Sequence, residues 1–133
     1  MLAAAQSPAP LAYVLDDEPQ VATLVSRALV AAGYAPQEFS SAAAFLDQVK
    51  RRTPRLIVLD LKLGESDTIA IMRQLAAESF GGRIMLISGR DASLLSDMEA
   101  IGRQLGLAML PSVAKPFRLN QLKECFGATL VGG

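Results

Sequence analysis

A run of four apolar residues that ends in a carboxylate, Leu56 to Asp60, limits the folds open to this chain. Two of the four, Ile57 and Val58, are β-branched, and the run is too short for a buried helix. It therefore suits a strand covered on both faces, as in the middle of a parallel sheet. Because open α/β sheets bind ligands beyond the carboxyl ends of their strands, Asp60 stands where chemistry is expected.

Other apolar runs alternate with helical periodicity on both sides of this strand. Further strands are predicted at residues 11–15, 34–39, 83–88 and 107–110. Pro36 and Pro111 favour edge positions for the second and fifth strands. The intervening segments carry apolar residues at three- and four-residue spacing, and Pro19 and Gly33 fit the start and end of the first helix. Five strands alternating with five helices predict an α/β fold, a doubly wound parallel sheet with helices on both faces.

The composition excludes several classes of function. The 133 residues contain 13 basic and 13 acidic side chains, so no net charge marks the chain for nucleic acid or an acidic membrane. Cys125 is the single cysteine and histidine is absent, which excludes an internal disulfide, a soft-metal cluster and His-dependent catalysis. Residues 1–10 are typical of a flexible tail, and no apolar run approaches a membrane span. We expect one soluble, cytoplasmic domain.

Polar residues that could bind a ligand or react lie at the ends of the predicted strands. In chain order they are Asp16, Asp17, Asp60, Ser88 and Lys115. All would meet at one edge of a parallel sheet. Crowded carboxylates repel one another unless they share a hard cation, and carboxylates with a carbonyl and waters typically hold Mg²⁺. A lysine and a hydroxyl would suit a phosphoryl group there, which makes Asp60 a nucleophile that can carry an acyl phosphate.

Four motifs together carry a resemblance to a known family. They are Val14 to Glu18, Ile57 to Asp60, Leu86 to Gly89 and Ala114 to Phe117. In this order and at these intervals they resemble the response-regulator receiver domain, the phospho-accepting half of two-component signalling. The resemblance implies a flavodoxin-like fold with strand order 2-1-3-4-5. It implies a receiver domain over residues 11–128 and a C-terminal tail at 129–133.

The resemblance also implies roles for the residues of the site. Asp60 would accept phosphate from a histidine kinase or a phosphotransfer protein. Asp17, Asp60 and the backbone carbonyl of Lys62 would bind Mg²⁺ directly, whereas Asp16 would act largely through water. Ser88 and Lys115 would contact the phosphoryl oxygens. The Lys115-Pro116 bond is cis in similar proteins.

Phosphorylation in similar proteins shifts a two-state equilibrium on the face of the fourth helix, fifth strand and fifth helix. The resemblance thus implies a phosphoacceptor with self-dephosphorylation rather than an enzyme, acting on an output domain or protein partner. A homodimer is among the assemblies it allows. The long fourth helix and the run at 106–116 resemble receivers fused to cyclic-di-GMP phosphodiesterase domains of the EAL type.

Three positions depart from the family pattern. Gly64 stands where similar domains often have proline, and Thr68 replaces a usual glycine, so we expect a more flexible loop. Ser112 stands where receivers commonly place a Tyr or Phe that swings inward on activation. We therefore expect switching to depend on Ser88 and the segment 89–93, and barely on Ser112.

Each residue also has a simpler interpretation. Asp16 and Asp17 could be an N-cap pair at the start of the first helix, and a lone serine such as Ser88 is more often a turn residue. Lys62 and Arg90, two residues beyond Asp60 and Ser88, are expected to be solvated, and the resemblance implies that these positions influence phosphoryl lifetime.

Three other functions are alternatives to a phosphoacceptor. A degenerate receiver would bind partners without phosphorylation. An aspartate-nucleophile phosphatase typically needs a second Asp two residues after Asp60, where this chain has Lys62. A nucleotide-binding module would need a glycine-rich loop after the first strand, where the acidic run Asp16 to Glu18 would repel phosphates.

Overall fold

The structure is a computed structural model, and it describes residues 9–63, 65–89 and 92–131. The strands are β1 (Leu11–Leu15), β2 (Ala35–Phe39), β3 (Leu56–Asp60), β4 (Arg83–Ser88), β5 (Ala108–Met109) and β6 (Val113–Ala114). The helices are α1 (Pro19–Ala32), α2 (Ala42–Arg51), α3 (Glu65–Ala77), α4 (Ala92–Gln104) and α5 (Leu119–Val131). A short 3-10 helix, η2 (Leu61–Leu63), follows β3 directly.

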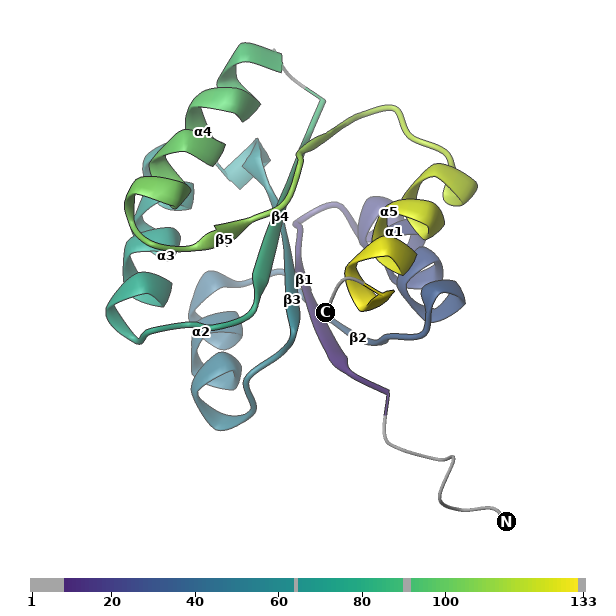
Figure 1. The fold of residues 1–133 in the computed structure, drawn as a ribbon, viewed down its shortest axis with the longest axis horizontal. Coiled ribbons are helices and arrows are strands. Elements are labelled where there is room, and N and C mark those ends of the chain that lie inside the picture. The colour runs from purple at the N-terminus through teal and green to yellow at the C-terminus, as the bar shows by residue number, and fades with distance from the viewer. Residues whose placement is uncertain (1–8, 64, 90–91, 132–133) are drawn as a thin grey trace.

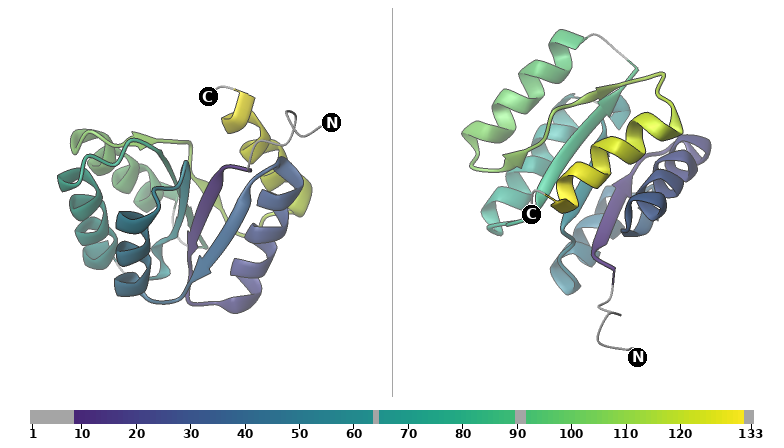
Figure 2. Two further views of the ribbon diagram at one scale, coloured as in Figure 1. Left: turned by 90° about the horizontal axis from the view of Figure 1, so that it is seen from below. Right: turned by 45° about the vertical axis from the view of Figure 1, so that its right-hand side comes forward.

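The strands form one parallel sheet in the order β2-β1-β3-β4-β5, with β6 also paired to β4. This order confirms the predicted 2-1-3-4-5 arrangement. β3 lies in the middle, between β1 and β4, and all five of its residues are buried. Helices cover both faces, with α1 and α5 on one side and α2, α3 and α4 on the other (Figures 1 and 2). The predicted doubly wound architecture is therefore confirmed.

Alternate residues of the central strands point into two separate cores, because successive side chains of a strand face opposite ways. Ile57 and Leu59 pack with residues of α2, α3 and α4 such as Phe45. Leu56 and Val58 pack on the other face with residues of α1 and α5. The uninterrupted apolar run of β3 is thus explained by burial on both faces, and it holds the end of the strand in a fixed position.

The predicted helix signals are present in the structure. Pro19 begins α1, and Gly33 ends it with φ 107°, a left-handed conformation that glycine adopts without steric cost. The side chain of Ser41 caps α2 by accepting a hydrogen bond from the Ala44 amide at 3.3 Å. These caps fix the points at which the chain returns to the sheet.

The fifth strand differs from the prediction of a single run at 107–110. β5 pairs with β4 through only two residues, and the strand is interrupted around Pro111. The chain then pairs with β4 again as β6. The Leu110 amide donates to the Ile84 carbonyl at 2.8 Å, and the Lys115 amide donates to the Ser88 carbonyl at 2.7 Å. Proline has no amide hydrogen, so the ladder cannot continue through position 111.

The terminal boundaries also differ from the predictions. α5 continues to Val131, so the C-terminal tail predicted at 129–133 is wrong for its first three residues. Thr129 is buried, and its hydroxyl donates to the Phe126 carbonyl at 2.7 Å and hydrogen-bonds the Tyr34 hydroxyl. These contacts hold the last turn of the helix against its neighbours. At the other end, residues 1–8 of the predicted tail lie outside the described residues.

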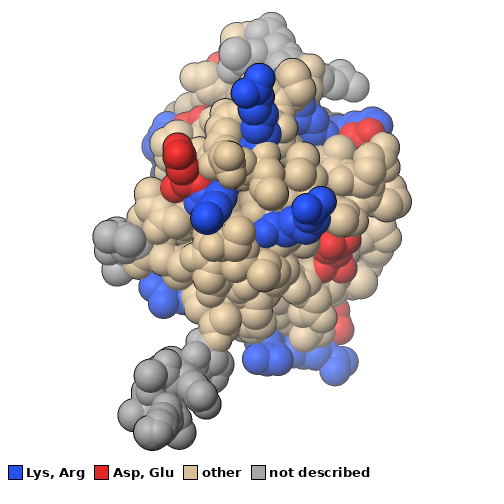
Figure 3. Space-filling view, turned by 90° about the vertical axis from the view of Figure 1, so that its right-hand side faces the viewer, with Lys and Arg blue, Asp and Glu red and all other residues tan. Residues whose placement is uncertain are grey.

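The surface over α1 and α5 mixes charges of both signs with uncharged side chains (Figure 3). Within the described parts of the chain, none of the helices has the length and apolar character needed to cross a membrane.

Gly82 precedes β4 at a point where a side chain has no room. A Cβ atom there would lie 2.8 Å from the Pro54 carbonyl oxygen and 2.9 Å from that of Arg55. Both oxygens belong to the backbone that enters β3, so Gly82→Ala should lower the free energy of unfolding by about 1–3 kcal/mol. Gly81→Ala is the matched control, because nothing lies within 4 Å of its added Cβ. Urea unfolding that ranks the two variants equally would contradict this packing.

Candidate functional site

The residues singled out from the strand ends meet at one edge of the sheet. Asp60 ends β3, Ser88 ends β4, and Lys115 directly follows β6, while Asp16 and Asp17 directly follow β1. Asp16, Asp60 and Ser88 are at most 3% exposed, whereas Asp17 is exposed. The parallel register places these ends side by side because β1, β3 and β4 are consecutive in the sheet. The structure therefore brings together all five residues predicted from the sequence.

Three carboxylates form a compact cluster at this edge. One oxygen from each of Asp16, Asp17 and Asp60 lies within 4.8 Å of the others. Asp16 Oδ1 accepts a hydrogen bond from the Glu18 amide at 2.9 Å, but Asp16 Oδ2 is buried and has no hydrogen-bond partner among the described residues. Buried carboxylate oxygens without a partner are costly. Hard oxygen ligands with one orphaned atom fit a divalent cation such as Mg²⁺.

The pKa of Asp16 is raised by its burial and by the neighbouring carboxylate. Burial, which is the largest cause, and the neighbouring Asp60 carboxylate together raise the pKa of Asp16 from its ordinary value of 3.8 to about 6. The hydrogen bond from the Glu18 amide and the charge of Lys115 oppose it. The metal-free protein thus carries like-charge repulsion that a bound cation would relieve.

Lys115 supplies the positive charge at the buried end of β3. Its Nζ lies 3.2 Å from Asp60 Oδ2, and the Lys62 amide donates to Asp60 Oδ1 at 3.1 Å. Burial alone would lower the pKa of Lys115, but the Asp60 charge and the hydrogen bonds to Asp60 and Glu18 raise it overall. The Lys115-Pro116 peptide bond is cis, as the resemblance implied.

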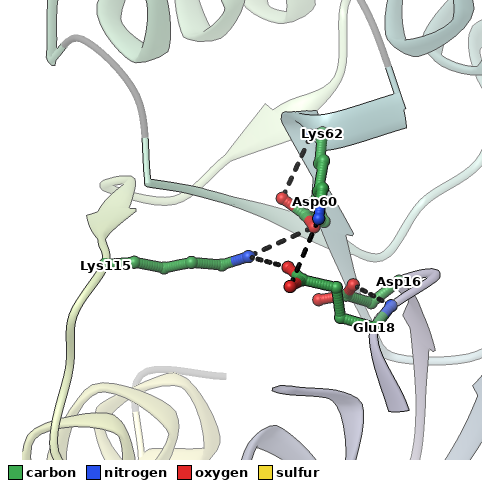
Figure 4. Close-up of polar contacts among 5 residues, drawn as sticks. All are labelled: Asp16, Glu18, Asp60, Lys62 and Lys115. Atoms are coloured by element: carbon green, nitrogen blue, oxygen red, sulfur yellow. Dashed lines mark hydrogen bonds and ion pairs between the residues drawn. The ribbon is translucent and has the colours of Figure 1, made fainter. Parts of the chain in front are cut away.

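Glu18 is a member of the site that sequence reasoning did not assign a role. Its Oε1 lies 3.2 Å from Lys115 Nζ, and its Oε2 lies 3.2 Å from Lys62 Nζ (Figure 4). Hydrogen bonds from Lys115 and then Lys62 lower the pKa of Glu18. Lys62 is about half exposed, which agrees with the expectation of a solvated side chain, and it also pairs with Glu18, which the sequence did not indicate. The sequence offers one signal for a role of Glu18 at the site, namely that it directly follows the acidic residues Asp16 and Asp17.

Ser112 makes a second contact that the sequence did not indicate. Its amide donates to Glu99 Oε2 on α4 at 3.0 Å, and its hydroxyl donates to the same oxygen. Glu99 Oε1 accepts from Arg103 one turn later, at 2.8 Å. Burial would raise the pKa of Glu99, but the Ser112 and Arg103 interactions outweigh burial and lower it. Position 112 is therefore connected to α4 by a hydrogen-bonded carboxylate rather than by a ring.

The remaining sequence predictions concern the loops around the site. Thr68 is buried within α3. Gly64, Arg90 and residue 91 lie outside the described residues, so the expectations of a flexible loop at Gly64 and of a solvated Arg90 lie there too. The segment 89–93, expected to carry the switch, falls partly in the same gap.

Taken together, the site combines a buried carboxylate, a lysine in contact with it, and a carboxylate cluster suited to a hard cation. The carboxylate of Asp60, held at the carboxyl end of β3, is a group that can act as a nucleophile toward an electrophilic phosphorus. Lys115 and a divalent cation would offset the negative charge of a phosphoryl group at this edge.

Comparisons with known proteins agree with this geometry. The model of the response regulator receiver domain family matches residues 12–126. The response regulator protein TodT of Pseudomonas putida is 28% identical over 118 residues, which cover 89% of this chain and 50% of TodT. The chain thus spans about half the length of that relative.

Solved structures show the same fold. A response regulator from Colwellia psychrerythraea has a TM-score of 0.77 and 25% identity, with 92% of this chain and 97% of that chain covered. A response regulator from Thermotoga maritima has the same TM-score at 18% identity, with 92% and 98% covered.

Removing the Asp16 charge should stabilise the metal-free protein. Since folding raises the Asp16 pKa from 3.8 to about 6, the folded state holds this proton more tightly, and stability falls as pH rises from about 4 to about 6. Asp16→Asn should remove this loss of stability with rising pH. It should raise the free energy of unfolding near neutral pH by on the order of 2 kcal/mol. Its amide can also donate to Asp60.

The measurement is urea unfolding with a chelator present, across this pH range. Asp17→Asn, at the exposed neighbour, is the control and should change the pH profile less. An Asp16→Asn protein that is less stable than the wild type near neutral pH would show that the Asp16 charge is not strained.

Proposed function

Because this chain belongs to the family of response regulator receiver domains, we propose that it takes a phosphoryl group on Asp60 and thereby controls an output. Receiver domains are generally phosphoacceptors rather than enzymes, and they bind Mg²⁺ at an acidic pocket. The observation that carries the proposal is the buried Asp60 carboxylate, held 3.2 Å from Lys115 Nζ beside the carboxylates of Asp16 and Asp17.

In the proposed reaction an oxygen of Asp60 attacks the phosphorus of the donor. The bond from phosphorus to the donor atom breaks, the donor keeps the electron pair, and an acyl phosphate forms on Asp60. Lys115 offsets the charge of the phosphoryl oxygens, and the hydroxyl of Ser88, buried at the end of β4, donates a hydrogen bond to one of them. In self-dephosphorylation water attacks the phosphorus, the bond from phosphorus to the Asp60 oxygen breaks, and inorganic phosphate leaves, which restores the carboxylate.

The residues that would hold Mg²⁺ are Asp17, Asp60 and the Lys62 backbone carbonyl, with Asp16 acting largely through water. When bound, the cation supplies positive charge that offsets the phosphoryl oxygens. The orphaned Asp16 Oδ2 and the close approach of the three carboxylates support this assignment.

The proposed phosphodonor is a histidine kinase or a phosphotransfer protein in the cytoplasm. The proposed output is a domain or protein that binds the face of α4, β5 and α5, and a second copy of the chain could bind there too. The run at 106–116 makes a cyclic-di-GMP phosphodiesterase domain of the EAL type one candidate output. The contact between Ser112 and Glu99 lies on this face. That switching barely depends on Ser112 stays a prediction.

The first test of this function is phosphate uptake. Intact mass after incubation with acetyl phosphate and Mg²⁺ should show one phosphoryl group on the wild type and none on Asp60→Asn. Asp97→Asn, which removes an exposed carboxylate from α4, is the matched control and should be labelled like the wild type. Equal labelling of Asp60→Asn and the wild type would assign the nucleophile to another residue.

The same assay measures the need for metal. A chelator should abolish labelling, and Asp17→Asn should shift half-maximal labelling to higher Mg²⁺ concentration, since a direct carboxylate ligand is lost. Labelling that is indifferent to both changes would contradict the metal assignment.

A further inference from the structure

Glu18 bridges two lysines from different parts of the site. It precedes α1 as the N-cap residue, yet its side chain makes no capping hydrogen bond. The carboxylate crosses instead to Lys115 after β6 and to Lys62 in η2, with one oxygen on each at 3.2 Å (Figure 4). The Glu18 side chain therefore pairs with two lysines instead of capping the helix, which indicates a role at the site.

The bridge uses the cations that a phosphoryl group would need. Lys115 Nζ contacts both Asp60 Oδ2 and Glu18 Oε1, each at 3.2 Å. A phosphoryl group on Asp60 adds oxygens next to the Asp60 carboxylate, and these oxygens require the same ammonium group. Glu18 therefore occupies, in the unphosphorylated protein, a position on Lys115 equivalent to that of an anionic oxygen of the product.

The contacts also show how Glu18 can be displaced. The Glu18 side chain is 29% exposed and that of Lys62 is 51% exposed, whereas Asp60 is 1% exposed. Lys115 is less exposed, at 17%, but Glu18 is the more exposed partner of that pair and can turn toward water, and partly exposed ion pairs are weak. Asp60 cannot leave, since it ends a strand that is buried on both faces.

We propose that Glu18 competes with the phosphoryl group for Lys115 and Lys62 and so lowers the affinity of the site for phosphoryl oxygens. It is a positioning residue that acts through the two lysines. The inference rests on the proposed function of Asp60 as the phosphoacceptor. It predicts that a neutral side chain of the same shape leaves both lysines available to the incoming group.

The test uses beryllofluoride, a phosphoryl mimic, titrated at saturating Mg²⁺ so that any effect of the Glu18 charge on metal affinity is removed. Glu18→Gln should bind beryllofluoride about fivefold more tightly than the wild type, the size expected for releasing partly exposed ion pairs. Glu124→Gln removes an exposed carboxylate from α5 and is the matched control, with an unchanged dissociation constant. The free energy of unfolding should stay close to that of the wild type for both variants.

A double mutant separates competition from a general effect of charge. In a Lys62→Met background one of the two Glu18 contacts is already lost, so Glu18→Gln should improve binding by less than it does in the wild type. Equal improvement in both backgrounds would overturn the bridge as the cause.

Unchanged or weaker beryllofluoride binding by Glu18→Gln would also overturn the proposal, because Glu18 would then be neutral or would orient the lysines for the ligand. If the wild type itself takes neither beryllofluoride nor phosphate, the proposed function fails, and the inference fails with it. Binding by the wild type without tighter binding by Glu18→Gln overturns the inference alone.

Discussion

The contact between the buried Asp60 carboxylate and the Lys115 ammonium is the interaction on which this edge of the sheet depends. Asp60 ends a strand with both faces covered, so water cannot solvate its charge. A buried carboxylate is tolerated only when it is paired and hydrogen-bonded. Lys115 satisfies one oxygen, and the Lys62 amide satisfies the other. The position of the last segment before α5 is therefore fixed by the charge at the end of β3.

This arrangement couples the site to the surface of the molecule. β6 joins β4 through only two residue pairs, and the Lys115 amide adds one bond to the Ser88 carbonyl. Three residues earlier, Ser112 is bonded to Glu99 of α4. A change in the partners of Lys115 would thus act on a short, weakly paired segment that contacts α4. The raised pKa of Asp16, which is caused mainly by burial of its carboxylate, is consistent with a site built for ligand binding rather than for maximal stability.

The architecture was predictable because burial leaves a strong imprint on sequence. The run Leu56 to Asp60 and the alternation around it specify a parallel sheet, and the strand ends then specify which polar residues meet. The bridge from Glu18 to Lys62 and Lys115 was not predictable, because pairing of side chains far apart in the sequence, 97 residues for Lys115, depends on rotamers that no local pattern encodes. The division of the fifth strand at Pro111 had a visible cause, but its return to β4 depends on tertiary contacts.

The most direct test of the account is a crystal structure with Mg²⁺ and beryllofluoride. We expect beryllium bound to an Asp60 carboxylate oxygen, the metal between Asp17 and Asp60, and Lys115 Nζ donating to a fluorine atom with Glu18 turned toward solvent. An unmodified Asp60 that keeps its contact with Lys115 at saturating ligand would contradict the account, as would a beryllofluoride group bound to any other residue.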